Sequence, residues 1–426
     1  MPDSGDTAAA RAAEAAARLS YGKLVAFLAG RSRDVAGAED ALSDAFAAAL
    51  ADWPRNGVPR TPDAWLLAVA KRRIVDALRR RYRDADAAQY LEWLSQLAPE
   101  TDDAAASIPD ERLQLMFACA HPALERSARA PLVLQAVLGF DAATIASAFL
   151  VAPAAMSQRL VRAKNKIREA GIALEMPEPG ELPARLECVL DSIYAVYAEG
   201  WSDPVGGDPH RRNLADEGIW LGRLVVSLMP DEPEALGLLA MMLHTHARRD
   251  ARRAADGAYI ALSEQDVRRW DGGMIEEAEA LLARASRAGR IGRYQLEAAV
   301  QSAHAMRRFG HRPDWQAIVQ LYDALCALSG SPVAALNRAV ALAERDGAAA
   351  GLAALDEVAG DARLLAYQPF WAARAELSAR VGAWQTCLDA YQRAIGLESD
   401  PAVRRFLLQR AQAARARSGQ SASPAE

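Results

Sequence analysis

Cysteine, aromatic residues and long apolar runs are all scarce in this chain of 426 residues. Its four cysteines lie far apart and lack C-x-x-C spacing, so free, mostly buried thiols in a reducing cytosol are expected: Cys119, Cys188, Cys326 and Cys387. No apolar run reaches membrane-spanning length, and the N-terminus lacks a signal-peptide core. We therefore expect a cytoplasmic protein without a membrane partner.

Signatures of catalysis are also missing. The sequence holds no glycine-rich phosphate loop, no G-x-S-x-G and no paired carboxylates with a base, so we expect neither an enzyme nor a cofactor. His244-Thr245-His246 resembles half of a metal site, but only Asp250 lies near enough to complete it. We interpret these histidines as a partly buried or surface pair and predict no metal.

Alanine and leucine dominate the composition, which is 51% hydrophobic and 6% aromatic. This bias favours an all-α protein. The length allows two to three domains. The net charge of −5 argues against a chain that binds polyanions over its whole surface, but the basic residues are clustered and a local patch matters more than the total.

Residues 141–168 are expected to form two helices joined by a tight turn. The second helix begins near Pro153, and its apolar residues recur at steps of three and four: Met156, Leu160, Ala163 and Ile167. Its opposite face carries five basic residues and no acid: Arg159, Arg162, Lys164, Lys166 and Arg168. Such a helix is suited to enter a major groove. A cationic surface helix is the alternative.

A second basic helix precedes this one. Residues 53–63 are a turn-rich stretch with three prolines and one glycine, and Thr61 followed by Pro62 predicts a helix start. The second half of that helix, residues 71–83, carries seven basic residues against one acid. A loop with Arg55, Asn56 and Arg60 beside such a helix suits a nucleic acid with an unstacked base. An ordinary basic helix end is the alternative.

An acidic amphipathic helix is expected within residues 34–54. Glu39, Asp40 and Asp44 fall on its exposed side, opposite an apolar stripe. Acids near a helix start interact favourably with the helix dipole, which alone explains them. A docking face for a basic partner helix is the functional interpretation.

These segments occur in a recognisable order. A helical domain ends in W-L-x-x-V-A-x-x-x-x-x-D-x-L-R-R (from Trp65), a polar linker follows, and a helix-turn-helix domain ends in R-L-x-R-A-K-x-K-I-R (from Arg159). The order resembles the sigma-70 family of bacterial transcription initiation factors, specifically its compact extracytoplasmic-function group. The resemblance implies a region 2 domain at 10–83, a linker at 84–107 and a region 4 helix-turn-helix domain at 108–170.

The resemblance also implies functional roles and partners: core RNA polymerase, through its β′ clamp and β flap, and promoter DNA. Clamp docking falls to Glu39, Asp40, Ser43 and Asp44. Recognition of the −10 element falls to Arg55, Asn56, Arg60, Trp65, Arg72, Arg73, Arg79 and Arg80. Recognition of the −35 element falls to Ser157, Gln158, Arg159, Arg162, Lys164 and Lys166. In the holoenzyme, such a protein is associated with the nucleoid.

Three residues depart from the family pattern. Many members have Gln where Ser43 stands, so the clamp contact differs in detail. Gly usually occupies the turn position of Leu150, and a leucine at positive φ would cost about 1 kcal/mol, so the turn is expected to be built differently. Ala155 stands where Thr commonly opens the recognition helix, so base preference at −35 does not transfer.

The remaining residues are expected to form a C-terminal helical repeat domain at 180–415. Six residues fall at tetratricopeptide spacing: Trp371, Ala375, Gly382, Cys387, Tyr391 and Ala394. Ile318, Tyr322 and Leu325 repeat the last three positions 69 residues earlier. A stack of paired helices explains the small residues, with a generic helical bundle as the alternative.

One motif interrupts this domain before a helix at 275–285: Asp271, Gly272, Gly273 and Met274. A plain turn explains it, with glycines at positive φ and a capping Asp. The same four residues occur in a subgroup of extracytoplasmic-function sigma factors with a fused tetratricopeptide-like domain, which this chain resembles. That resemblance implies a regulatory or supporting extension that contacts the sigma domains or the linker.

The leading hypothesis is a sigma factor that binds core polymerase and directs promoter-specific initiation. One alternative is a helix-turn-helix adaptor tethered to DNA, whose repeat domain binds a protein partner. Another is a one-component regulator that acts without polymerase. The helix from Trp65 to Arg83 and the loop before it separate these hypotheses, because a simple regulator does not need them.

Overall fold

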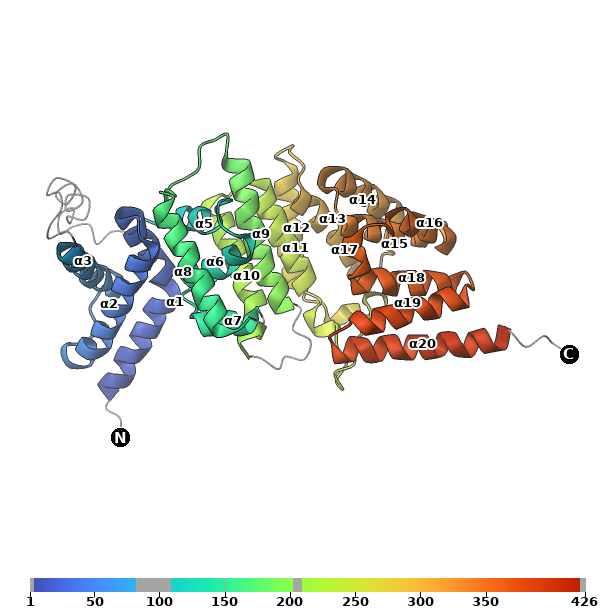
Figure 1. The fold of residues 1–426 in the computed structure, drawn as a ribbon, viewed down its shortest axis with the longest axis horizontal. Helices are drawn as coiled ribbons and strands as arrows, with labels where there is room; N and C mark the ends of the chain where they lie inside the picture. Colours follow the sequence, from blue (N-terminus) through green and yellow to red (C-terminus); the bar gives the residue numbers. More distant parts are fainter. Residues whose placement is uncertain (1–3, 82–108, 150, 202–208, 422–426) are drawn as a thin grey trace. The chain divides into compact units, whose positions relative to one another are not determined.

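The computed structural model describes residues 4–81, 109–149, 151–201 and 209–421. Across these ranges the regular structure is helical, and a single β-bridge joins Arg253 to Tyr259, so the predicted all-α class is confirmed (Figure 1). None of the helices in these ranges is both long and apolar enough to span a membrane. The linker predicted at 84–107 and the turn residue Leu150 lie outside the described residues.

The chain forms two compact units, Met1–Gly200 and Trp201–Glu426. The sequence interpretation starts the C-terminal domain at 180, whereas the first unit extends twenty residues further, to Gly200. The difference concerns one helix, α9 (Leu182–Trp201), nearly all of which belongs to the first unit.

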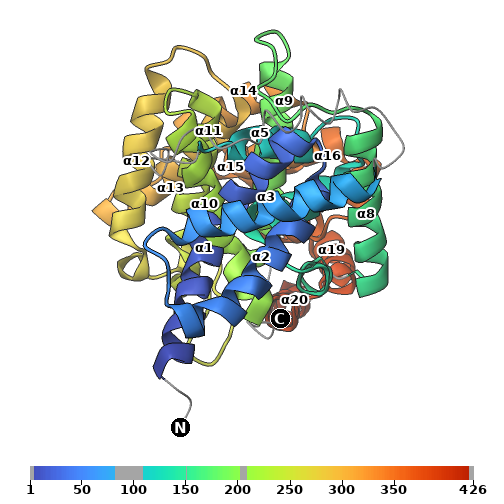
Figure 2. The same ribbon diagram turned by 90° about the vertical axis from the view of Figure 1, so that its left-hand side faces the viewer.

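The first three helices of the chain pack on one another: α1 (Ser4–Ser32), α2 (Val35–Asn56) and α3 (Pro62–Arg81). Figure 2 shows them face on. Asp34 caps α2, because its side chain accepts a hydrogen bond from the Gly37 N–H. The helix α3 begins at Pro62, as the Thr-Pro pair predicts.

The loop predicted at 53–63 is shorter than expected. Helix α2 continues through Pro54 to Asn56, and the loop starts at Gly57, whose φ is 84°. Pro54 lacks the N–H that would bond to the Leu50 carbonyl, but this part of the helix surface is exposed, so water can take its place. The Gly57 N–H donates to the Trp53 carbonyl at 3.0 Å and closes the last turn.

Four shorter helices follow: α5 (Arg112–Cys119), α6 (Arg126–Leu138), α7 (Ala142–Ala148) and α8 (Pro153–Glu169). Gly139 ends α6 in the left-handed region, and Asp141 then caps α7 by accepting from the Thr144 N–H at 2.9 Å. Helices α7 and α8, the two helices predicted there, pack against each other, and their assignment as a DNA-binding helix-turn-helix stays a prediction. The four predicted apolar positions of α8 are all buried, which confirms that pattern.

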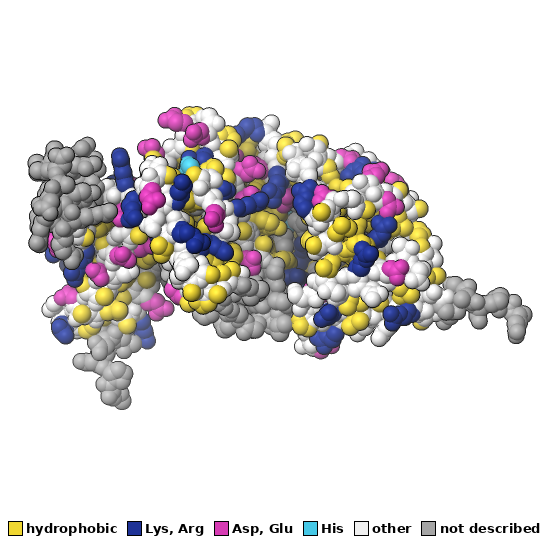
Figure 3. Space-filling model, viewed as in Figure 1, with side chains coloured by type: hydrophobic (Ala, Val, Ile, Leu, Met, Phe, Trp, Pro, Cys, Tyr) yellow, Lys and Arg dark blue, Asp and Glu magenta, His cyan; other side chains and the backbone are white. Residues whose placement is uncertain are grey.

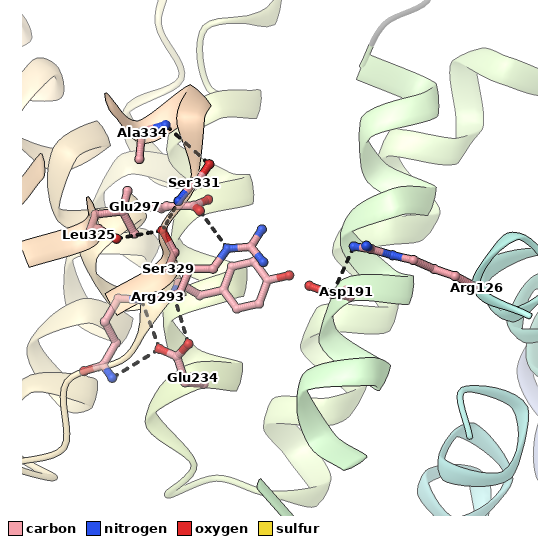
Figure 4. A network of polar contacts seen from close by, with 11 residues as sticks. Arg126, Asp191, Glu234, Arg293, Glu297, Leu325, Ser329, Ser331 and Ala334 are labelled. Carbon is pink, nitrogen blue, oxygen red and sulfur yellow. Dashed lines mark hydrogen bonds and ion pairs between the residues drawn. The ribbon is translucent and has the colours of Figure 1, made fainter. Parts of the chain in front are cut away.

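Helix α9 is fastened to α5 and α6 by polar contacts. The Arg185 guanidinium donates to the Phe117 carbonyl at 3.0 Å, and Arg129 contacts the Cys188 sulfur at 3.5 Å. Arg126 reaches Asp191 at 3.5 Å, as Figure 4 shows. These contacts tie α9 to the end of α5 and to the first turns of α6.

The second unit is a succession of helices in which chain neighbours pack against each other (Figure 1). They are α10 (Pro209–Leu228), α11 (Pro233–His246), α12 (Gly272–Ser286), α13 (Arg293–Ala305), α14 (Trp315–Ser329), α15 (Pro332–Asp346), α16 (Ala348–Val358), α17 (Ala362–Leu365), α18 (Gln368–Arg380), α19 (Trp384–Leu397) and α20 (Pro401–Ser421). Short 3₁₀ turns occupy part of the connection between α11 and α12.

Most of the repeat positions predicted from spacing lie in or beside the core of these helical hairpins. Gly382 makes the turn between α18 and α19 at a φ of 77°. Cys387, Tyr391 and Ala394 pack against α18 and α20, and Ile318 and Leu325 are buried on α14. The stacked-hairpin architecture follows the spacing, and its assignment to the tetratricopeptide class stays a prediction.

The half-buried carboxylate of Glu234 joins α11 to α13 in this unit. Glu234 accepts from the backbone N–H groups of Tyr294 and Gln295 at 3.0 and 3.2 Å, at the first turn of α13 (Figure 4). The helix dipole favours an anion at this position. A Cβ at Gly292 would stand 2.2 Å from the Glu234 carboxyl carbon, so only glycine leaves room for this contact.

Candidate polymerase and promoter interface

The acidic face predicted on α2 is only partly available. Asp40, Ser43 and Asp44 are exposed. Asp44 and Arg73 of α3 lie 3.9 Å apart, and both side chains are more than half exposed, so their attraction is weak. These three side chains are therefore accessible to solvent in this structure.

Glu39 does not lie on the exposed side, which corrects the sequence expectation. Its residue exposure is 8%, and its Oε2 accepts a hydrogen bond from Lys164 of α8. Its Oε1 is buried and has no hydrogen-bond partner. Burial raises the pKa of the Glu39 carboxyl, and the nearby Lys164 ammonium opposes that shift without cancelling it. Glu39 is buried because α8 packs against this end of α2, a tertiary contact that the local sequence does not indicate.

The predicted −10 residues cluster around the end of α2 and the exposed side of α3. Arg55, Asn56, Arg60, Arg72 and Arg73 are exposed. Arg55, Asn56 and Arg60 border or lie in the loop that begins at Gly57, and Arg72 and Arg73 continue the cationic surface further along α3. Such an arrangement fits a single strand whose phosphates need cations.

Trp65 is half-buried rather than freely exposed. Its ring meets that of Trp53 edge to face, with centroids 5.6 Å apart and planes at 65°. The contact holds the indole in one orientation at the start of α3. The side chains of Arg79 and Arg80, also predicted to bind the −10 element, lie outside the described part of the structure.

Most of the predicted −35 residues are accessible on α8. Ser157, Gln158, Arg162 and Lys166 are exposed, and Arg159 is half-buried, with its guanidinium 3.4 Å from the Ser127 carbonyl oxygen. Figure 3 shows Lys and Arg side chains along the surface that α8 occupies in Figure 1. This face has the charge that a major-groove helix needs.

Lys164 is the exception among the −35 residues. Its side chain is 12% exposed and faces α2 instead of solvent. It follows the buried Leu160 by one helical turn, so it lies at the edge of the apolar stripe. The four-residue spacing from Leu160 indicates in the sequence that Lys164 lies beside the buried stripe. The prediction that Lys164 lies on the outer face with Arg162 and Lys166 is therefore wrong.

The motif at 271–274 forms the start of α12. The Asp271 carboxylate accepts from the Met274 N–H at 3.0 Å, which is an N-cap contact. A Cβ at Gly272 would stand 2.7 Å from the Arg308 guanidinium, and Met274 packs beside the buried Trp270. Gly273 is exposed, and a Cβ there would meet only Asp271, at 3.4 Å. Three of the four residues thus have local structural roles.

The two histidines of α11 face different carboxylates. His244 Nε2 lies 3.4 Å from Glu279, and His246 Nε2 lies 3.3 Å from Asp216. Burial and the nearby Arg248 lower the pKa of His244 to about 4, so this imidazole is neutral at pH 7. The described residues contain no cluster of three or more candidate metal ligands.

Comparisons with known proteins agree with this geometry. Residues 17–84 match the Sigma-70 region 2 family, and residues 185–286 match a family of unknown function (DUF6596). An uncharacterized protein of Rhizobium meliloti (strain 1021), R00370, is 40% identical over 368 residues, which cover 85% of this chain and 86% of that protein. No solved structure matches the chain.

Helices α1 to α3 lie in the segment that matches Sigma-70 region 2, and this match supports a sigma-70-family factor, a class that binds core RNA polymerase and promoter DNA. The chain belongs to the same family as the Rhizobium protein, and it carries a helical C-terminal region that includes the match to the family of unknown function.

Proposed function

We propose that this protein is an extracytoplasmic-function sigma factor that acts in the cytoplasm and directs promoter-specific initiation. The observation that carries the proposal is the pairing of an acidic face on α2 with a cationic loop and helix face at 55–73, inside the segment that matches region 2. An adaptor tethered to DNA by α8 alone would have no use for this second cationic surface.

Each surface has a task in this proposal. Asp40, Ser43 and Asp44 dock on the β′ clamp. The loop after Gly57 receives an unstacked base of the −10 element, while Arg72 and Arg73 hold backbone phosphates. The polymerase supplies all the chemistry, and this chain supplies recognition and strand capture.

The second DNA contact belongs to α8, next to the polymerase β flap. Ser157 and Gln158 stand in the first turns of the helix, where a recognition helix approaches base edges, and Arg162 and Lys166 are placed for phosphates. Loss of a phosphate-binding cation should weaken binding to all promoters similarly and reduce the salt dependence.

Run-off transcription with purified core polymerase tests the proposal. We expect a promoter-specific transcript that falls at least about tenfold in an Arg72→Gln, Arg73→Gln double variant, since each lost phosphate contact weakens DNA binding. Arg11→Gln, an exposed cation near the start of α1 with no proposed DNA contact, is the matched control. Binding to DNA without any promoter-specific transcript from the wild-type protein would favour the adaptor instead.

The C-terminal region, in this proposal, regulates or supports sigma activity through a tetratricopeptide-like stack, with the motif at 271–274 as a contact site. Gly273→Ala is the informative variant, because position 273 is exposed and has room for a methyl group. We expect run-off transcript levels to change while the melting temperature stays the same. Gly396→Ala, at another unobstructed glycine, is the control. Unchanged transcript levels would show that the motif serves only to start helix α12.

A further inference from the structure

The predicted clamp-binding and −35-binding surfaces contact each other within the first unit. Lys164 of α8 donates to Glu39 of α2, and the two side chains are only 12% and 10% exposed. One turn further along α8, Arg168 lies 3.7 Å from Asp34, the residue that caps α2. Two cations of the helix-turn-helix therefore meet two acids at the start of the polymerase-docking helix.

A close backbone contact supports this pairing. At Gly22 of α1, a Cβ would stand 2.1 Å from the Val137 carbonyl oxygen of α6, so the two helices touch without an intervening side chain. At the end of α1, Arg31 pairs with Glu111, just before α5, at 3.1 Å. Helices α1 and α2 thus hold the helix-turn-helix domain at several points along their length.

The pair at the centre of this contact is imperfectly satisfied. Glu39 keeps one buried oxygen without a hydrogen-bond partner, while Lys164 has lost most of its access to solvent. Removing one partner of a buried ion pair leaves the other charge isolated, which strongly disfavours the arrangement that buries it. If the two domains separate, both charges can be hydrated by water or can pair with opposite charges on polymerase or DNA. The contact can therefore form and break reversibly, as a latch does.

We propose that the pairs Lys164–Glu39 and Arg168–Asp34 form a latch that keeps the free protein closed. In the closed state, Glu39 is withheld from the polymerase clamp and Lys164 is withheld from DNA. A ligand that binds only the open state has its apparent affinity reduced by the fraction of open molecules. Core polymerase and promoter DNA therefore compete with the latch. This inference rests on the roles proposed above for α2 and α8.

Binding of the full-length protein to core polymerase in the absence of DNA tests the latch. Lys164→Gln removes the latch cation and leaves every clamp-facing residue intact, so we expect the apparent Kd to fall about tenfold, reflecting a larger open fraction. Arg168→Gln, on the more exposed outer pair, should shift the Kd in the same direction by less. Arg126→Gln, an exposed cation on α6 of the same domain, is the matched control and should leave the Kd unchanged.

Hydrogen exchange gives a readout that needs no polymerase. In Lys164→Glu, amides at the start of α2 and in the second half of α8 should exchange faster than in the wild type. Glu39→Lys alone should do the same, whereas the double variant with the charges exchanged should restore slow exchange. A merely misfolded variant would show no such rescue.

The outcomes separate the two proposals. Unchanged core affinity in Lys164→Gln and Arg168→Gln, with wild-type protein that does bind core, would overturn the latch and leave the sigma role intact. Wild-type protein that fails to bind core would overturn the sigma role, while the exchange experiment still decides whether the two helices are held together by these charges. Failure of the charge exchange to restore slow exchange would also count against the latch.

Discussion

Asp141 shows how one carboxylate fixes the start of the helix-turn-helix. Its two oxygens accept from the Thr144 hydroxyl and from the backbone N–H groups of Ala143 and Thr144. The Thr144 hydrogen bonds, side chain first, hold the pKa of this carboxyl below its usual value. The stabilisation is therefore complete above the pKa of an ordinary aspartate and is lost as the pH falls through the depressed value.

Asp141→Ala should destabilise α7 by about 1 kcal/mol, because two backbone donors lose their acceptor. Hydrogen exchange of the α7 amides at pH 7 should then speed up about fivefold. Asp141→Asn keeps the acceptor oxygen and should show most of the wild-type protection, but without the loss of protection at acidic pH. Equal exchange rates in wild type and Asp141→Ala would show that the cap contributes nothing.

At the level of secondary-structure elements, the crossing of α1 and α6 depends on Gly22. Alanine normally favours a helix interior over glycine by about 1 kcal/mol. Here the added methyl would meet the Val137 carbonyl oxygen, a backbone atom that cannot rotate away, so the helices must move apart. Overpacking of this kind typically costs about 1–3 kcal/mol, which outweighs the gain in helix propensity.

We therefore expect Gly22→Ala to lower the unfolding midpoint of the protein and to raise hydrogen exchange along both α1 and α6. Gly396→Ala in α19 is the control, because nothing lies within 4 Å of its added Cβ, and it should leave the midpoint unchanged or raise it slightly. A Gly22→Ala protein as stable as the wild type would show that the two helices tolerate a wider spacing.

Features that depend on local sequence were predictable. The Thr61-Pro62 start of α3 and the buried stripe of α8 follow from capping and periodicity, and the structure confirms both. The burial of Glu39 was not predictable, because it depends on α8 lying over α2, more than a hundred residues away in the chain. The predicted loop start at residue 53 was wrong for a different reason. Proline often ends a helix, but the surface around Pro54 is exposed, so α2 continues to Asn56.

The clamp and promoter residues were assigned by resemblance, and the geometry sorts them only in part. Exposure agrees with the assignment at Asp40, Asp44 and Arg162 and disagrees at Glu39 and Lys164. A helical wheel places Lys164 beside the apolar stripe, but it cannot say which neighbour covers that edge. Three-dimensional packing between separate domains supplied that information.

At the scale of the whole molecule, the boundary between the two units matters for any shortened protein. Arg185 of α9 donates to the Phe117 carbonyl near the end of α5, a group that no later residue of α5 can satisfy. A fragment ending at residue 180 loses that contact and the others made by α9, whereas a fragment ending at Gly200 retains them.

We expect the fragment ending at residue 180 to unfold at lower urea concentration than the one ending at Gly200. The loss at the Phe117 carbonyl alone is about 1–3 kcal/mol if the group stays buried without a partner. Intrinsic fluorescence and circular dichroism during urea unfolding would measure the difference. Coinciding midpoints would show that α9 is dispensable to the helix-turn-helix domain.

The contact between Glu39 and Lys164 also restricts how this protein can diverge. A substitution at Lys164 that altered promoter preference would at the same time strand a buried carboxylate on the polymerase-docking helix. A substitution at Glu39 would do the converse. In the proposed sigma role, promoter choice and polymerase affinity are therefore coupled at these two positions, and a lineage that changes one residue is expected to change the other.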